Sequence, residues 1–304
     1  MKLNEKIKDI NEADDLLHKP DTTVKWRESY YFGWADLTNK ISGFSTIGLV
    51  PNEKRRELVF LLFYDNKREV YYREPALLNL VDDINLMLKD KRLTYRLIKP
   101  FQKWEVIYKC HKFTVNIIFD SRFSTYYFGE AASWYQHFET STIIKGEIIF
   151  KDGRIKKIQG YGQRDKSWGF RDWHQFDRWH HANFQFKDWS CAFRKDYIKD
   201  TIDLSGYIAT KEGAIPVSNV EVEIIEDADK YNTPLITNYT ITDKKDHIFN
   251  ITAKPIDNNT SFRFARDIQG GYTEMFDQMV TMENKDTGEI GSGISELLRT
   301  KFFA

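Results

Sequence analysis

The chain has 304 residues, more than one ordinary hydrophobic core serves, so two domains of about 150 residues or one large β architecture are expected. Lysine plus arginine and aspartate plus glutamate both total 45, and this neutrality argues against nucleic acid or an anionic membrane as partner. The two cysteines, Cys110 and Cys191, lie far apart, which indicates neither a disulfide framework nor a cysteine-based zinc site and fits a reducing compartment.

The N-terminal segment MKLNEKIKDINEADDLL is charged throughout and lacks the apolar run of a signal peptide. No stretch approaches the roughly 18 apolar residues of a membrane-spanning helix. We therefore expect a soluble, cytoplasmic protein with no integral membrane segment.

The N-terminal half reads as β structure after a short charged helix expected within 4–18. Runs rich in Val, Ile, Phe, Tyr and Trp recur about every 8–12 residues between turn residues, which predicts a meander in a sandwich or barrel. These runs are 24–34, 43–50, 57–64, 68–73, 93–99, 103–109 and 112–120. The segment 77–90 fits either a helix or a strand and loop.

Two further strands, 145–150 and 154–164, are joined at Asp152-Gly153, a strong hairpin signal. Beyond residue 189 the β pattern resumes at 190–196, 202–210, 214–225, 235–242, 247–254, 262–268, 272–282 and 289–298. Because the second half repeats the design of the first, two barrels or sandwiches that meet near residue 160 are the simplest architecture.

The stretch 160–189, GYGQRDKSWGFRDWHQFDRWHHANFQFKDW, holds four of the eight tryptophans and three of the seven histidines. Large aromatic side chains left in water forfeit roughly 1.5–3 kcal/mol each, so the stretch either plugs a core or lines a cavity. Domain junctions are preferred places for pockets. We favour a cavity with an apolar ligand.

Asp165 is the acid at the centre of this stretch. If 158–168 is one regular strand, alternation puts Asp165 on a polar face and Lys166 on the opposite face. Desolvation of that polar face would raise the pKa of Asp165 and make it a general acid near neutral pH. The alternative is an ordinary ion pair with Arg164 or Arg171.

The surrounding aromatic and histidine residues have two interpretations. Trp168, Trp173 and Trp179 could wall a ligand site or stabilise a cation, or they could simply pack in a core. His180 alternates with apolar residues, which is more typical of a core histidine than of a catalyst. A second group, Glu130 near Trp134, likewise fits either a site or barrel-wall packing.

Metal and dinucleotide sites are not indicated. His174, Asp177, His180 and His181 form a possible zinc ligand set, but no further ligand stands at a known spacing, so no metal is expected. GYGQRD resembles the start of GxGxxG, yet Asp165 stands where the third glycine belongs. No cofactor is predicted.

The segment GYGQRDKSWGFRDW resembles the signature of two-domain lipocalin-like (calycin) proteins related to carotenoid 1,2-hydratase and AttH, a superfamily that includes kievitone hydratase and fungal Diels–Alderases. TVKWRESYYFGWADLTNKISGFSTIGLVPNE at 23–53, HFE at 137–139 and GSGISE at 291–296 support it. The resemblance implies an all-β fold of two lipocalin-like antiparallel barrels side by side. We expect an N-terminal barrel over 1–158 and a C-terminal barrel over 159–304 that carries RDKSWGFRDW.

In the hydratase branch the acid of this motif is thought to protonate an alkene, and this role carries over to Asp165. Trp168 or Tyr161 could then stabilise the resulting cation. Lys166 occupies the place where the pattern usually has histidine. A lysine close to Asp165 would lower its pKa, whereas an outward-facing Lys166 would leave it unaffected.

These observations predict a cofactor-independent enzyme that acts on a small hydrophobic, unsaturated substrate, isoprenoid- or polyketide-like, by acid-assisted hydration, isomerisation or cyclisation. The alternative is a lipocalin-like carrier without chemistry. The candidate catalytic residues are Asp165, Trp168, Tyr161, Asp172 and His180. The candidate substrate-binding residues are Trp173, Trp179, Trp134, His181 and Glu130.

Overall fold

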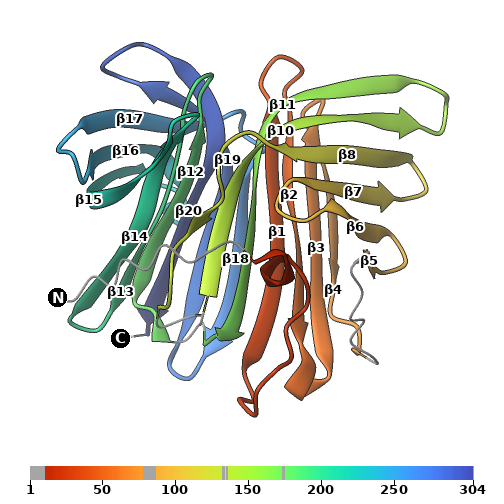
Figure 1. Cartoon of the computed structure of the whole chain (residues 1–304), viewed down its shortest axis with the longest axis horizontal. Helices are drawn as coiled ribbons and strands as arrows, with labels where there is room; N and C mark the ends of the chain where they lie inside the picture. The colour runs from red at the N-terminus through yellow and green to blue at the C-terminus, as the bar shows by residue number, and fades with distance from the viewer. Residues whose placement is uncertain (1–10, 78–86, 132–133, 135, 173–174, 304) are drawn as a thin grey trace.

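The structure is a computed structural model that describes residues 11–77, 87–131, 134, 136–172 and 175–303. Its regular secondary structure is almost entirely β, in two antiparallel sheets that lie side by side (Figure 1). The all-β class with two barrel-like units is thereby confirmed. None of the helices in the described ranges has the length and apolar character that crossing a bilayer requires.

The N-terminal sheet has eleven strands in the order β4-β3-β2-β1-β11-β10-β8-β7-β6-β5, with β9 beside β10. No pairing between described residues joins β4 to β5, so this sheet is an open half-barrel. Its strands are β1 (Trp26–Asp36), β2 (Ile41–Val50), β3 (Arg55–Tyr64), β4 (Lys67–Arg73), β5 (Met87–Lys89), β6 (Leu93–Lys99), β7 (Lys103–Lys109), β8 (Phe113–Ser121), β9 (Tyr126–Tyr127), β10 (Gln136–Phe150) and β11 (Ile155–Phe170).

The C-terminal sheet runs β17-β16-β15-β14-β13-β12-β20-β19-β18 and closes into a barrel, because β17 also pairs with β19. Its strands are β12 (Arg178–Gln185), β13 (Ser190–Ile198), β14 (Thr201–Thr210), β15 (Gly213–Glu226), β16 (Pro234–Asp243), β17 (Ile248–Pro255), β18 (Ser261–Ile268), β19 (Gly271–Asn284) and β20 (Ile290–Phe302). β18 lies outside this closed ring, beside β19.

The long hairpin of β10 and β11 turns at the predicted Asp152-Gly153. Gly153 has a φ of 88°, a left-handed conformation that suits glycine, and Ile149 pairs with Ile155 directly beside the turn. From there the two strands pair without interruption to Gln136 and Trp168. This unbroken register brings distant polar residues of the two strands opposite each other.

The strand pairing corrects the expected position of the RDKSWGFRDW motif. β11 pairs with β1 and β10, so the strand that carries most of the motif belongs to the N-terminal sheet and not to the C-terminal barrel. The C-terminal sheet begins only with β12, at Arg178. Regular alternation shows that a segment is a strand, but it does not show which neighbours the strand will have.

Two smaller expectations concern short elements. Of the predicted helix over 4–18, residues 4–10 lie outside the described residues, and Glu12–Asp15 form a single 3-10 turn, η1. A second 3-10 turn, η2, spans Pro51–Glu53. Within 77–90, residues 78–86 lie outside the described part, and 87–89 form β5.

Strands at the interface between the two sheets are buried on both faces. On β1 all residues except Tyr31 are buried, because even-numbered side chains such as Phe32 enter the core of the N-terminal sheet while odd-numbered ones face the barrel. Phe44, Val59, Met279 and Ile294, drawn from both sheets, form one apolar cluster between them. The two sheets therefore pack β1 and β11 against β12 and β20.

Candidate active site between the two sheets

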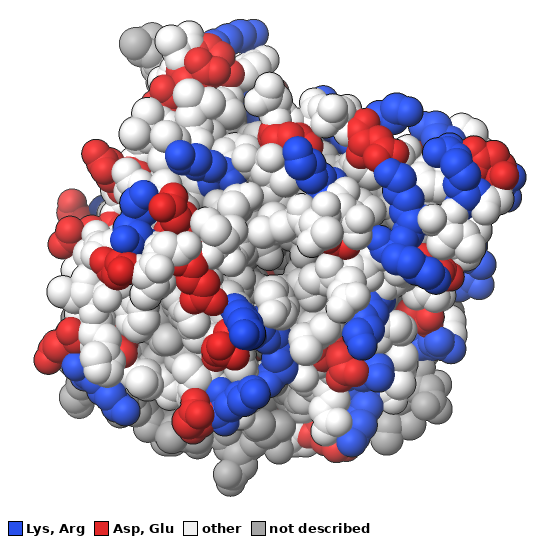
Figure 2. All heavy atoms as spheres, turned by 90° about the horizontal axis from the view of Figure 1, so that it is seen from above, with Lys and Arg blue, Asp and Glu red and all other residues white. Residues whose placement is uncertain are grey.

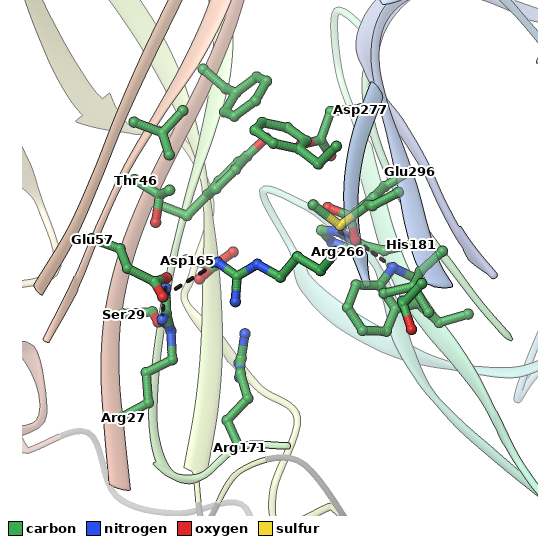
Figure 3. A pocket seen from close by; sticks show the side chains of 18 of the residues that line it. Arg27, Ser29, Thr46, Glu57, Asp165, Arg171, His181, Arg266, Asp277 and Glu296 are labelled. Carbon is green, nitrogen blue, oxygen red and sulfur yellow. Dashed lines mark hydrogen bonds and ion pairs between the residues drawn. The ribbon is translucent and has the colours of Figure 1, made fainter. Parts of the chain in front are cut away.

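A pocket of about 170 Å³ lies between the sheets, outside both barrel interiors (Figure 3). A cavity of about 150 Å³ accepts benzene, so this pocket has room for at least a ring-sized part of a ligand. Its apolar wall is supplied from both sheets by Tyr31, Phe44, Val59, Trp179, Met275 and Leu298.

Asp165 lies in this pocket on β11, with its side chain 15% exposed. Burial, followed by the neighbouring charge of Glu139, raises its pKa to about 7 against the opposing effects of His181 and Arg171. A carboxyl group with this pKa is partly protonated at neutral pH and can donate its proton. The raised pKa matches the expectation from the sequence.

The alternative ion pairs of Asp165 do not govern its charge. Arg164 points to the opposite face of β11 and makes a two-point ion pair with Asp15, at 2.8 and 2.9 Å. Arg171 lines the same pocket as Asp165 and lowers its pKa, but Nη2 of Arg171 donates to Oγ of Ser167, and burial outweighs the arginine charge.

A row of buried titratable groups begins at Asp165. Nε2 of His137 lies 3.9 Å from Oδ1 of Asp165 and 3.6 Å from Oε1 of Glu139. Nε2 of His181 lies 3.1 Å from the same Glu139 oxygen, and its Nδ1 lies 4.0 Å from Oε1 of Glu296. The row thus reaches from the N-terminal sheet to the barrel.

The two histidines of this row differ in charge. Burial, together with the positive charges of His181, Arg194 and Arg171, holds the pKa of His137 well below its usual value, so His137 is neutral. Burial also disfavours charge on His181, but the hydrogen bond and charge of Glu139 prevail and raise its pKa to about 9. At neutral pH the row therefore contains one neutral and one protonated imidazole.

A second acid pair occupies the barrel side of the pocket. Asp277 on β19 stands opposite Glu296 on β20, and burial followed by the charge of Glu296 raises the pKa of Asp277 well above its usual value. Nε1 of Trp179 donates to Oε1 of Glu296 at 2.5 Å. The buried Asp277 carboxyl therefore resists ionisation beside Glu296, whose carboxylate accepts the indole hydrogen bond.

One group of side chains has the spacing of a metal site. The ligand atoms of His137, Glu139 and Asp165 all lie within 4.8 Å of one another. Three cations stand beside them, since Arg171, Arg194 and protonated His181 all affect the pKa of His137 or Asp165. This positive surrounding opposes a divalent ion, so the expectation of no metal stays our prediction.

The pocket brings together three of the predicted site residues: Asp165, Trp179 and His181. Trp134 lies just behind the lining, where the guanidinium groups of Arg194 and Arg171 stand 4.8 and 5.9 Å from its ring. Tyr161 lines a separate, smaller cavity further along β11.

Three predicted catalytic residues lie elsewhere. Trp168 is on the opposite face of β11, stacked on His18 at 3.8 Å. Asp172 forms an ion pair with Lys25 outside the pocket. His180 lies beside Tyr197, and burial lowers its pKa to about 3, as expected of a core histidine. The positions of Trp168 and His180 follow from β alternation, which sends neighbouring residues to opposite faces, whereas Asp172 lies beyond the end of β11.

Of the remaining candidates, Glu130 is exposed and does not line the pocket. Trp173 and His174 lie outside the described residues. Lys166 is fully buried, not outward-facing: it pairs with Glu28 inside the N-terminal core, on the face opposite Asp165.

Four residues at the site were not among those predicted from the sequence: His137, Glu139, Arg171 and Asp277. For the first two a signal existed, because a turn at Asp152-Gly153 with two uninterrupted strands places Glu139 opposite Asp165. No such local signal pointed to Asp277, which comes from another sheet.

Comparison with known proteins gives one family and a shared fold. A family model described as "Domain of unknown function (DUF7064)" matches residues 11–301. No curated protein matches the chain.

Three solved structures share the whole architecture. An AttH-like protein from Nitrosomonas europaea is 13% identical with a TM-score of 0.72, over 97% of this chain and 98% of that one. CghA, crystallised with Sch210972, is 9% identical with a TM-score of 0.65, over 91% and 89%. Kievitone hydratase from Nectria haematococca is 9% identical with a TM-score of 0.58, over 96% and 95%. These likenesses confirm the two-domain lipocalin-like fold expected from the motif.

Proposed function

We propose that this chain, which belongs to the DUF7064 family, is a cofactor-independent enzyme that binds an apolar, unsaturated substrate between its two sheets and protonates it from Asp165. The reaction class is acid-assisted hydration, isomerisation or cyclisation. The single observation that carries the proposal is a carboxyl group with a pKa of about 7 in a pocket with an apolar wall.

The proposed step moves one proton and needs no redox partner. The carboxyl proton of Asp165 passes to a carbon or carbonyl oxygen of the substrate, and a water molecule or an internal nucleophile adds to the activated position. The proton released by that nucleophile, or lost from a neighbouring carbon in an isomerisation, returns to the Asp165 carboxylate. General acid catalysis of this kind typically contributes about 10²–10⁴ in rate.

Two of the structural neighbours support the class of chemistry. One is named a hydratase and another was crystallised with a small molecule, so this fold serves ligand binding and catalysis in those proteins. At 9% identity their substrates do not transfer to this chain.

The test is turnover by Asp165→Asn, on the apolar compound that copurifies with the protein and is identified by mass spectrometry. We expect turnover to fall about 10²–10⁴-fold while ligand binding persists. Asp172→Asn is the matched control, because Asp172 is a nearby acid outside the pocket, and its turnover should stay within about threefold.

Turnover by Asp165→Asn within about threefold of wild type would contradict the general-acid role. Recovery of the same unaltered ligand from wild type and from Asp165→Asn would instead support the carrier function that the sequence left open.

A further inference from the structure

Four arginines line the pocket: Arg27 on β1, Arg171 after β11, Arg194 on β13 and Arg266 on β18. On the face seen from above, acidic and basic side chains are interspersed, and the chain as a whole is neutral (Figure 2). The arginines therefore mark a local concentration of positive charge and not a general property of the surface.

The carboxylate of Glu57 is shared among several of these cations. Nη1 of Arg27 lies 2.5 Å from Oε2 of Glu57, while Arg55 and Arg266 both approach Oε1. Despite its burial, these cations lower the pKa of Glu57 to about 2. Three guanidinium groups thus share the single negative charge of Glu57, although Arg55 also contacts Glu53.

Arg266 reaches across the gap between the sheets. Its guanidinium lies 3.4 Å from Glu57 on β3 and 3.7 Å from Glu74, which directly follows β4, and its side chain is 48% exposed (Figure 3). Contacts this long at a wet site are worth little. An anionic ligand can replace them without leaving a buried charge unpaired.

Arg171 enters the pocket from the other side, below Asp165 (Figure 3). Burial, followed by the like charges of Arg194 and Arg27, lowers its pKa to about 9. Arg171 and Arg194 stand near the same Trp134 ring, at 5.9 and 4.8 Å, which agrees with this repulsion. Arg171 therefore faces two like charges, which Asp165 and Glu296 oppose.

The acids of the pocket do not fully offset this field. Burial and the facing charge of Glu296 raise the pKa of Asp277 and disfavour a second negative charge in that pair, and Asp165 carries only part of a charge. Glu274 is engaged by Arg263, Arg299 and Lys301. His181 is paired with Glu139, and Arg194 with Asp196. Glu57 and Glu296 then remain against Arg27, Arg171 and Arg266, so the excess of positive charge is small and suits a ligand with one negative charge.

We propose that the pocket contains a subsite for the ionised carboxylate of an apolar organic acid, held between Arg171 and Arg266 beside Asp165. The planar guanidinium fork matches the two oxygens of a carboxylate. The apolar body of the ligand lies against Phe44, Val59 and Leu298. The role of this subsite in turnover rests on the proposed function, whereas the binding itself does not.

The subsite also fits the proposed chemistry. A substrate that becomes cationic on protonation would be repelled by Arg171, and a carboxylate bound there removes part of that repulsion. A conjugated carboxylate also places its double bond within the same pocket as Asp165. The substrate class is therefore an unsaturated, apolar monocarboxylic acid.

The test compares 2-naphthoate with its neutral isostere 2-naphthamide by isothermal titration calorimetry at pH 7. Wild type should bind the acid at least about tenfold more tightly, since hydrogen bonds to charged groups are the strong ones. Arg171→Gln should remove most of this preference, and Arg266→Gln part of it. The exposed Arg154→Gln serves as the control and should change nothing.

Equal affinity for acid and amide, no measurable binding of the acid, or a preference untouched by both pocket substitutions would overturn the subsite. Tighter binding of 2-naphthyl phosphate than of 2-naphthoate would overturn the carboxylate assignment. Because the side chain of Arg266 is about half exposed, Arg266→Gln should fold, and it keeps the test decisive if Arg171→Gln does not fold.

Asp165→Asn separates this inference from the proposed function. It should retain the preference for 2-naphthoate over 2-naphthamide even though turnover is lost. Retained preference with undiminished turnover would refute the acid role alone, whereas lost turnover with no preference in wild type would refute the subsite alone.

Discussion

Glu139 and Asp165 occupy directly opposed positions on β10 and β11. Glu139 is fully buried and Asp165 retains 15% exposure, so neither charge is well solvated. Like charges opposite each other on a sheet repel, so the pair is more stable when it keeps a proton. The hairpin register thereby builds a proton donor into the wall of the pocket.

Asp165→Asn should stabilise the protein above neutral pH. The folded pKa of about 7 exceeds the ordinary value near 3.9, so wild type loses stability as the pH rises from about 4 to 7. Three pKa units correspond to at most about 4 kcal/mol, and the variant should exceed wild type by roughly 1–4 kcal/mol at pH 8 but not at pH 4. Urea unfolding across this range measures the difference. A difference that does not vary with pH would contradict the raised pKa.

His180 and His181 are adjacent in sequence, but their pKa values should be shifted in opposite directions. At neutral pH His181 should be protonated, because its pKa is about 9, and His180 neutral, because its pKa is about 3. The stability that His181 contributes is complete below about pH 6.5 and is lost as the pH rises through 9. Nitrogen-15 NMR of labelled histidine, assigned with His180→Gln and His181→Gln, reads both charges directly. Two neutral rings at pH 7 would refute this account.

The ion pair of Asp15 with Arg164 should anchor the N-terminal segment. Both side chains are at most 1% exposed, and Asp15 also accepts from the backbone nitrogen of Phe101 at 2.7 Å. Asp15→Ala should cost about 3–5 kcal/mol, since it strands a buried guanidinium. Asp152→Ala, which removes an exposed partner of Arg154, is the control and should leave the urea midpoint unchanged.

Lys166 should matter for stability and not for the acidity of Asp165. Lys166→Met leaves the buried carboxylate of Glu28 without its ammonium partner and should cost about 3–5 kcal/mol. The double variant with Glu28→Gln should recover much of that loss, because it removes the stranded charge. The pH dependence of Asp165, followed as above, should be the same in the double variant as in wild type. A shift would show that Lys166 acts on the acid through the strand.

Local patterns in the sequence predicted much of the architecture. Alternating apolar residues and turn residues marked most strands, and Asp152-Gly153 marked the central hairpin. Alternation also placed Asp165 and Lys166 on opposite faces, which the structure confirms. These features depend on backbone geometry within a few residues, and that geometry is encoded locally.

Only the tertiary structure decided which sheet β11 joins and what meets Asp165 there. Trp168 belongs to the same motif as Asp165, yet its side chain lies on the opposite face of β11, stacked on His18. Asp277 and Arg266 arrive from strands more than a hundred residues away. Such contacts depend on how two sheets twist and pack, and the free energy of that packing is spread over the whole interface, so no single sequence pattern reports it.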